Sequence, residues 1–203
     1  MFPIIYLITK GNLTSQNFAK ESKNTLQVIQ AAVRTRVSLI QIREKLLPAN
    51  LVYQLAIEAK EITKNTSIKI LINDRVDITV GANADGVHLP ESSVMPTIIP
   101  NNLRSNLTIG ASTHSLNRAK LLKEQGADFV VLGPVFHTPS KAKYGNPLGL
   151  EKLSQICEEL TPFPVIAVGG INKQNYQSIL KSGASGFASI RFLNNIENLK
   201  KLK

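Results

Sequence analysis

Side chains that can bind anions, move protons or hold metals recur just after the short apolar runs of this sequence. Arginine and lysine pair with phosphate or carboxylate groups, histidine transfers protons near neutral pH, and a carboxylate can ligate a hard cation. Glycine and serine add backbone and hydroxyl donors for phosphate oxygens. The candidate site residues are Gln41, Arg43, Lys45, Asn73, Asp74, His88, Ser112, His114, Thr138, Ser140, Lys141, Gly169, Gly170, Ser189, Ile190 and Arg191.

Gln41 and Arg43 lie two residues apart in one apolar run, so their side chains point to the same side of a strand. A buried arginine requires an anionic partner, because an unpaired buried charge is costly. A structural ion pair with Glu44 or Asp74 would supply one. The neighbouring Lys45 favours the other interpretation, which is an anionic ligand.

The last two apolar runs end in residues that predict a phosphate cradle. Gly169 and Gly170 end one run, and Ser189–Arg191 ends the next. Glycines let backbone N–H groups approach phosphate oxygens at a helix N-terminus. The alternative is a tight turn into a helix capped by Asn172. Arg191 either clamps the phosphate or faces solvent.

His88 and His114 each end an apolar run. His114 is a candidate general acid/base, because the unperturbed imidazole pKa of ~6.5 suits proton transfer near neutrality. The alternative is a structural histidine that caps the helix beginning at Ser115. Asp74 is a candidate metal ligand, and a pair with Arg75 is the alternative.

The segment Gly133–Pro147 is long and polar in an otherwise lean chain. Loops of this kind are often lids. We expect Thr138, Ser140 and Lys141 to close over a phosphate, with a solvated loop as the alternative.

Eight short and almost continuously apolar runs position these residues. Strands that are apolar on both faces are typical of a parallel sheet, and eight of them alternating with helices predict one (β/α)₈ barrel over residues 1–203. Active sites of this fold lie at the carboxyl ends of the strands, so the candidates should share one site. A doubly wound open sheet is the alternative, but its usual Gly-rich first turn is absent.

The predicted strands are Ile4–Thr9, Leu39–Arg43, Lys69–Asn73, Gly86–Leu89, Thr108–Ser112, Phe129–Gly133, Pro164–Gly169 and Gly186–Ile190. The predicted helices are Lys20–Arg36, a helix with Pro48 in its first turn, Val76–Ala82, Ser115–Gln125, Gly149–Leu160, Lys173–Lys181 and Asn194–Leu202.

Composition excludes several classes of protein. The 203 residues are 43% hydrophobic, which excludes disorder, and the single cysteine excludes a disulfide scaffold. No run reaches the ~20 apolar residues of a membrane span, and the N-terminus resembles a strand more than a signal peptide. We therefore expect a cytoplasmic protein with no membrane partner. The net charge of +10 favours anionic partners, and without a nucleic-acid-binding motif we expect small phosphates, not nucleic acid.

Several segments match a known family in order and spacing. They include QIREK at 41–45, LINDRVD at 71–77, NADGVHL at 83–89, IGASTHS at 109–115, GADFVVLGPVF at 126–136 and PVIAVGGI at 164–171. On these motifs the chain resembles the thiamin phosphate synthase/TenI family along almost its entire length. The resemblance implies a (β/α)₈ barrel that acts on a phosphorylated thiazole in thiamin biosynthesis. Family members often self-associate, so a homo-oligomer stays open.

The resemblance implies one of two activities. The synthase couples a pyrimidine methyl pyrophosphate to the thiazole phosphate, with Mg²⁺ bound by two aspartates. Asp74 matches the first aspartate, whereas Ser93 stands at the second and Glu91 lies off the ligand position. Losing one carboxylate should weaken Mg²⁺ binding, because this ion requires oxygen ligands in octahedral geometry. The residues that match the synthase's pyrophosphate-binding pattern are Gln41, Arg43, Lys45, Asn73, Asp74, Ser112 and Lys141.

The TenI-type thiazole tautomerase lacks the metal pair. It converts a carboxylated thiazole phosphate tautomer to the aromatic form, using a histidine that matches His114. Because Ser93 stands where the synthase has its second aspartate, we predict a tautomerase without a metal cofactor, in which His114 moves the proton. The alternatives are the Mg²⁺-dependent synthase and a non-catalytic barrel that binds thiazole phosphate.

Overall fold

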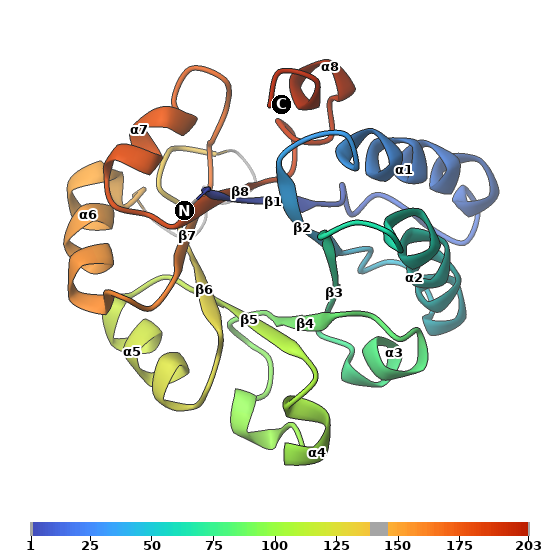
Figure 1. The fold of residues 1–203 in the computed structure, drawn as a ribbon, viewed down its shortest axis with the longest axis horizontal. Helices are drawn as coiled ribbons and strands as arrows, with labels where there is room; N and C mark the ends of the chain where they lie inside the picture. The colour runs from blue at the N-terminus through green and yellow to red at the C-terminus, as the bar shows by residue number, and fades with distance from the viewer. Residues whose placement is uncertain (1, 139–145, 203) are drawn as a thin grey trace.

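Eight parallel strands close into a barrel in the order of the sequence (Figure 1). The structure is a computed structural model and describes residues 2–138 and 146–202. β8 closes the ring by pairing with β1, where Ile5 lies beside Phe187. The strands are β1 (Ile4–Ile8), β2 (Val37–Ile42), β3 (Lys69–Asn73), β4 (Gly86–Leu89), β5 (Thr108–Thr113), β6 (Phe129–Leu132), β7 (Val165–Val168) and β8 (Gly186–Ser189). The predicted (β/α)₈ barrel is confirmed.

All eight predicted strands are present; β3 and β4 have the predicted ends, and the ends of the other strands differ from the prediction by at most two residues. The difference matters at β2, which ends at Ile42 and leaves Arg43 just beyond the strand. The Arg43 backbone N–H donates to the Thr9 hydroxyl at 2.9 Å instead of to a neighbouring strand. Arg43 therefore begins the loop at the carboxyl end of the barrel.

Helices surround the barrel and cover its outer face (Figure 1). They are α1 (Phe18–Ala32), α2 (Ala49–Thr63), α3 (Val76–Gly81), α4 (Asn101–Arg104), α5 (Leu116–Glu124), α6 (Gly149–Leu160), α7 (Tyr176–Lys181) and α8 (Ile196–Leu199), with a 3₁₀ turn η1 (Pro96–Ile98). No helix within residues 2–138 and 146–202 is long and apolar enough to cross a membrane.

The sequence prediction misjudged several helices. It missed η1 and α4, because three or four residues are too few to show a helical period. It placed Pro48 inside α2, whereas Pro48 is extended (ψ 159°) and immediately precedes that helix. It also made α1, α7 and α8 longer than they are, since turns replace their predicted ends.

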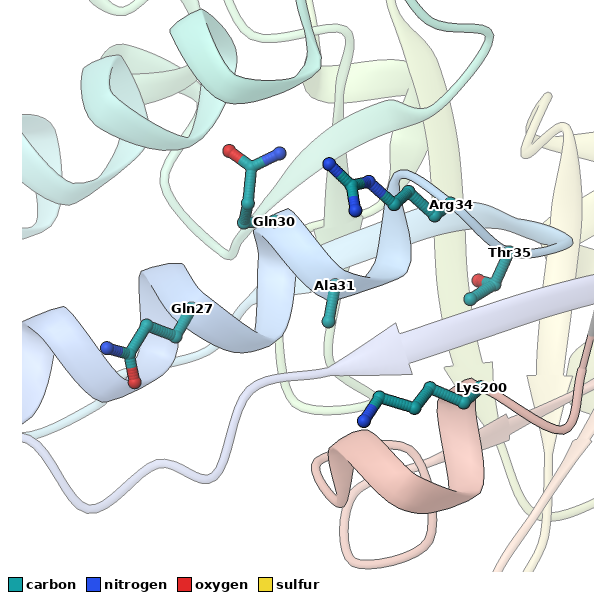
Figure 2. A pocket seen from close by; sticks show the side chains of 6 residues that line it. All are labelled: Gln27, Gln30, Ala31, Arg34, Thr35 and Lys200. Carbon is teal, nitrogen blue, oxygen red and sulfur yellow. The ribbon is translucent and has the colours of Figure 1, made fainter.

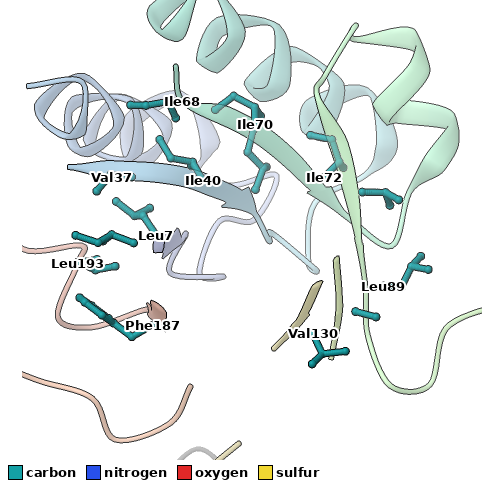
Figure 3. Packing of buried hydrophobic residues seen from close by; sticks show 14 of the residues in the cluster. Leu7, Val37, Ile40, Ile68, Ile70, Ile72, Leu89, Val130, Phe187 and Leu193 are labelled. Atoms are coloured by element: carbon teal, nitrogen blue, oxygen red, sulfur yellow. The ribbon is translucent and has the colours of Figure 1, made fainter. Parts of the chain in front are cut away.

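Every strand is buried on both faces, which explains why the apolar runs are almost continuous. Ile70 and Ile72 of β3 pack outward in the cluster shared with the helices (Figure 3). Leu71, between them, belongs to the second cluster, which fills the barrel interior. The interior cluster consists of Tyr6, Ile8, Leu39, Leu71, Phe129, Val131, Ile166 and Ala188. This packed interior forms the floor beneath the polar end of the barrel.

Candidate functional site

A cavity of about 610 Å³ opens at the carboxyl end of the barrel, and every strand or its following loop contributes to it. Active sites of (β/α)₈ barrels lie at this end. Its lining residues are Ile8, Gln41, Arg43, Lys45, Asn73, His88, Pro90, Glu91, Ser92, Ser112, His114, Val131, Val168 and Ile190. Eight of the predicted site residues therefore meet in one cavity: Gln41, Arg43, Lys45, Asn73, His88, Ser112, His114 and Ile190.

Arg43 has no carboxylate partner among the residues that the structure describes. Glu44 was the predicted alternative, but its side chain turns away. It is buried and accepts the backbone N–H groups of Gly11 and Leu13, each at 3.0 Å. The structural ion pair is therefore ruled out, and Arg43 lines the cavity together with Lys45. Two cations at one edge suit an anionic ligand.

The barrel interior holds a polar chain beneath the cavity. The Gln41 amide donates to the Tyr6 hydroxyl at 3.3 Å, and that hydroxyl lies 3.3 Å from His88 Nδ1. His88 Nε2 lies 2.8 Å from the Ser112 hydroxyl. Burial, and secondarily the charge of Arg43, lowers the pKa of His88 to about 3, so the imidazole is neutral at physiological pH. Burial raises the pKa of Tyr6, so its phenol stays protonated.

His114 lies between β5 and α5 and is held on both ring nitrogens. Nδ1 bonds to the Gly133 carbonyl, and Nε2 lies 3.2 Å from the Glu91 carboxylate. A carbonyl oxygen only accepts hydrogen bonds, so Nδ1 carries the hydrogen and Nε2 is the nitrogen that can exchange a proton. The predicted alternative, a helix cap, is wrong. Ser115 itself caps α5 by accepting the Arg118 N–H at 3.3 Å.

Asp74 follows β3 in a left-handed backbone conformation (φ 65°). Its carboxylate accepts a hydrogen bond from the Ser93 hydroxyl. The predicted alternative, a pair with Arg75, is wrong because Arg75 binds Asp77 at 2.5 Å. The structure therefore brings Ser93, the residue at the second aspartate position, against Asp74. Within the described ranges no three His, Cys, Asp or Glu side chains group as a metal site.

The residues of the predicted phosphate cradle differ in how they lie relative to the cavity. Ile190 lines the cavity, whereas the Arg191 side chain is exposed and lies outside the lining. The buried Ser189 hydroxyl accepts the Phe192 N–H at 3.3 Å. A Cβ at Gly169 would lie 2.6 Å from Pro134 Cα, so this glycine allows a close backbone approach. Phosphate binding by backbone N–H groups here stays a prediction.

About half of the predicted lid, residues 139–145, lies outside the described residues. Ser140 and Lys141 fall in residues 139–145, so their predicted roles stay predictions. Thr138, the last residue before them, is half-buried.

Sequence reasoning missed the contacts that Tyr6 and Glu91 make with predicted site residues. Tyr6 was assigned only to a strand, although it alternates with Ile8 and so faces the interior beside Gln41. Glu91 was considered only as a metal ligand, whereas it contacts His114. The strand period would have revealed Tyr6; no local pattern could have revealed the loop contact of Glu91.

A second pocket of about 380 Å³ lies away from the candidates (Figure 2). It is lined by Gln27, Gln30, Ala31, Arg34, Thr35 and Lys200, between α1 and the end of the chain. Lys200 already pairs with Glu197 at 2.6 Å. None of the predicted site residues lies here, so the cavity at the carboxyl end is the candidate site.

Comparison with known proteins gives consistent matches. The family described as thiamine monophosphate synthase matches residues 5–193. A relative from Geobacter sulfurreducens is 39% identical over 92% of this chain and 84% of its own length. "Thiamine-phosphate synthase" from Clostridium novyi is 35% identical over 92% of this chain and 88% of its own.

Solved structures agree with these matches. A thiamine phosphate pyrophosphorylase from Pyrococcus furiosus has a TM-score of 0.78 and 30% identity, covering 98% of this chain and 94% of that one. A 3-hexulose-6-phosphate synthase, at 14% identity and a TM-score of 0.67, shares the fold alone.

The names of the relatives support the synthase alternative better than the predicted tautomerase, which is not confirmed. The match spans nearly the whole barrel, including every strand that lines the cavity. The chain therefore belongs to the thiamine monophosphate synthase family of thiamine-biosynthesis enzymes.

Proposed function

We propose that this protein is a thiamine-phosphate synthase that joins a pyrimidine methyl pyrophosphate to a thiazole phosphate. The observation that carries the proposal is the meeting of Gln41, Arg43, Lys45, Asn73 and Ser112 in one cavity. These residues match the family's pyrophosphate-binding pattern, and a tautomerase has no need of a full pyrophosphate site. The names of the relatives favour the same reaction.

In this reaction the bond from the pyrimidine methylene carbon to the pyrophosphate oxygen breaks, and the electron pair leaves with pyrophosphate. The thiazole nitrogen forms the new bond to the same carbon. Arg43 and Lys45 would bind the leaving pyrophosphate, since charge-assisted hydrogen bonds to phosphate are strong. Backbone N–H groups near Gly169, Gly170 and Ile190 would hold the thiazole phosphate from the opposite wall.

The synthase reaction implies Mg²⁺, and Asp74 would be its protein ligand, assisted by the Ser93 hydroxyl. Mg²⁺ in proteins is commonly held by one or two carboxylates together with substrate phosphates. Asp74 supplies one such carboxylate, which in this structure accepts the Ser93 hydroxyl. When bound, the ion would offset the charge that develops on the leaving group.

A tautomerase is the second candidate, and two observations favour it. Ser93 replaces the second carboxylate, and His114 faces the cavity with Nε2 beside Glu91. A histidine held by its Nδ1–H can remove a proton from a thiazole tautomer and return it elsewhere on the ring. In this reaction aromatisation supplies the driving force, without a metal.

A coupling assay separates the two candidates. Purified protein, Mg²⁺, pyrimidine methyl pyrophosphate and aromatic thiazole phosphate are mixed, and thiamin phosphate is measured as its fluorescent oxidation product. We expect product, and a strong loss of product in Arg43→Gln. No product beside an active control synthase would overturn the proposal.

The same preparation is then given the unaromatised carboxylated tautomer, and the aromatic product is measured. Conversion that disappears in His114→Asn would establish the tautomerase. If neither substrate set reacts, only the non-catalytic binding barrel remains.

A further inference from the structure

Four polar side chains form one hydrogen-bonded row from the barrel interior to the cavity: Gln41, Tyr6, His88 and Ser112. We propose that Tyr6 and His88 are positioning residues that turn the Ser112 hydroxyl into a hydrogen-bond donor toward an anion in the cavity. Only the identification of that anion as substrate pyrophosphate rests on the proposed function.

The row is held rigidly. Tyr6 is 0% exposed and Gln41 is 1% exposed. The Tyr6 ring meets Phe129 edge-on, with ring centroids 5.8 Å apart. Gly110 leaves room for the rings of Phe129 and His88, since a Cβ there would lie 2.3 Å from Phe129 Cζ and 3.0 Å from His88 Nδ1. Neither Tyr6 nor His88 can turn to another partner without repacking the interior.

Buried groups fix the direction of the hydrogen bonds. The Gln41 amide N–H donates to the Tyr6 oxygen. The phenol hydrogen must then also find an acceptor, because a buried donor without one is costly. Among the described residues, His88 Nδ1 is the other atom that forms a hydrogen bond with this hydroxyl, so Tyr6 donates to Nδ1. Because Nδ1 accepts this hydrogen bond it carries no hydrogen, so the ring hydrogen of His88 sits on Nε2.

The position of the hydrogen on His88 in turn fixes the direction of the hydrogen bond to Ser112 at the cavity. Nε2–H donates to the Ser112 oxygen at 2.8 Å, so the Ser112 hydrogen points elsewhere. Ser112 is half-buried and lines the cavity, where its hydroxyl can donate to an anion. In the other tautomer of His88, Ser112 would donate to the imidazole and turn only lone pairs toward the anion. Tyr6 thus determines whether the Ser112 hydroxyl donates a hydrogen bond to the anion, although Tyr6 does not contact Ser112.

The first test measures the tautomer of His88 in the free protein. Long-range proton–nitrogen correlation spectra distinguish the protonated ring nitrogen from the bare one. We expect the hydrogen on Nε2 in the wild type, and a shift toward Nδ1–H in Tyr6→Phe, where the donor to Nδ1 is lost. A wild-type His88 with its hydrogen on Nδ1 overturns the proposal, whatever reaction the enzyme catalyses.

The second test measures binding of inorganic pyrophosphate by calorimetry. We expect Tyr6→Phe to weaken binding about 3- to 10-fold, the value of one hydrogen bond. Tyr53→Phe is the matched control, because it removes the same atom from an exposed residue on α2. It should leave binding unchanged.

A double-variant comparison separates positioning from a general structural effect. In a Ser112→Ala background, Tyr6→Phe should cause no further weakening, because the hydroxyl it orients is gone. Equal weakening in both backgrounds would mean that Tyr6 supports the cavity in another way, and would contradict the proposal. If the wild type does not bind pyrophosphate, the proposed function fails, while the tautomer measurement still decides the role of Tyr6.

Discussion

The two walls of the cavity are built from different parts of the chain. The β2–β5 wall presents charged and polar side chains, among them Arg43, Asn73 and His114. Among the residues that the structure describes, the β6–β8 wall presents the apolar side chains of Val131, Val168 and Ile190, so this part of the wall offers an anion backbone N–H groups. Anion binding at the β2–β5 wall therefore depends on the identity of the side chains, whereas anion binding at the β6–β8 wall depends on the path of the backbone.

On the polar wall, this contrast predicts a large loss of anion binding when Arg43 is changed. Arg43→Gln should weaken inorganic pyrophosphate binding about 10- to 150-fold, because a hydrogen bond to a charged group contributes about 1.5–3 kcal/mol. Arg191→Gln is the matched control, since it removes the same charge from an exposed residue outside the cavity lining. Calorimetric titration measures both. Similar losses in the two variants would mean that overall charge, not the wall, attracts the anion.

On the β6–β8 side of the barrel, the effect of a substitution should depend on the room available next to the backbone. Gly149, at the start of α6, has φ 74° and no atom of the described residues within 4 Å of a new Cβ, so Gly149→Ala should cost only the strain of its backbone, about 1–3 kcal/mol. Gly169→Ala (φ 101°) adds a clash with Pro134 and should cost at least about 1 kcal/mol more through overpacking. Urea unfolding gives both free energies. Equal costs would show that the backbone at Pro134 shifts readily to accommodate the new Cβ.

The acid dependence of stability should be traceable to His88 on the polar wall. Its folded pKa of about 3 lies below the unfolded value of about 6.5, so the unfolded chain binds the proton first. As the pH falls from about 6.5 to 3, this residue should lower the free energy of unfolding by up to about 1.4 kcal/mol per pH unit. His88→Gln should remove that slope, and His137→Gln, an exposed control, should keep it. A steep slope that persists in His88→Gln would assign the acid sensitivity to other groups.

The smallest expected effect is at Ser93, and it tests the metal assignment. Ser93→Asp places a second carboxylate beside Asp74, so without metal the like charges should lower the melting temperature. Added Mg²⁺ should then raise the melting temperature of the variant more than that of the wild type. Ser92→Asp adds the same charge one residue away and serves as the control. No difference between the two variants would mean that Ser93 does not face a cation site.

Apolar periodicity was enough to predict the barrel and its eight strands. The runs around Ile70–Ile72 and Val165–Val168 are apolar at every position because both faces are buried, and this pattern is local in sequence. Element ends were less predictable. Whether Arg43 ends β2 or follows it depends on the Thr9 hydroxyl, which belongs to another strand.

By itself, the sequence determined the fold, the family and the end of the barrel at which the candidate residues lie. These features depend on local periodicity and on motifs. The tertiary structure decided the partners. Glu44 turned to the backbone of Gly11 and Leu13, Asp74 met Ser93, and Glu91 met His114. These contacts join residues far apart in the chain. Their hydrogen bonds and charges are set by how neighbouring loops approach each other, which no local pattern records.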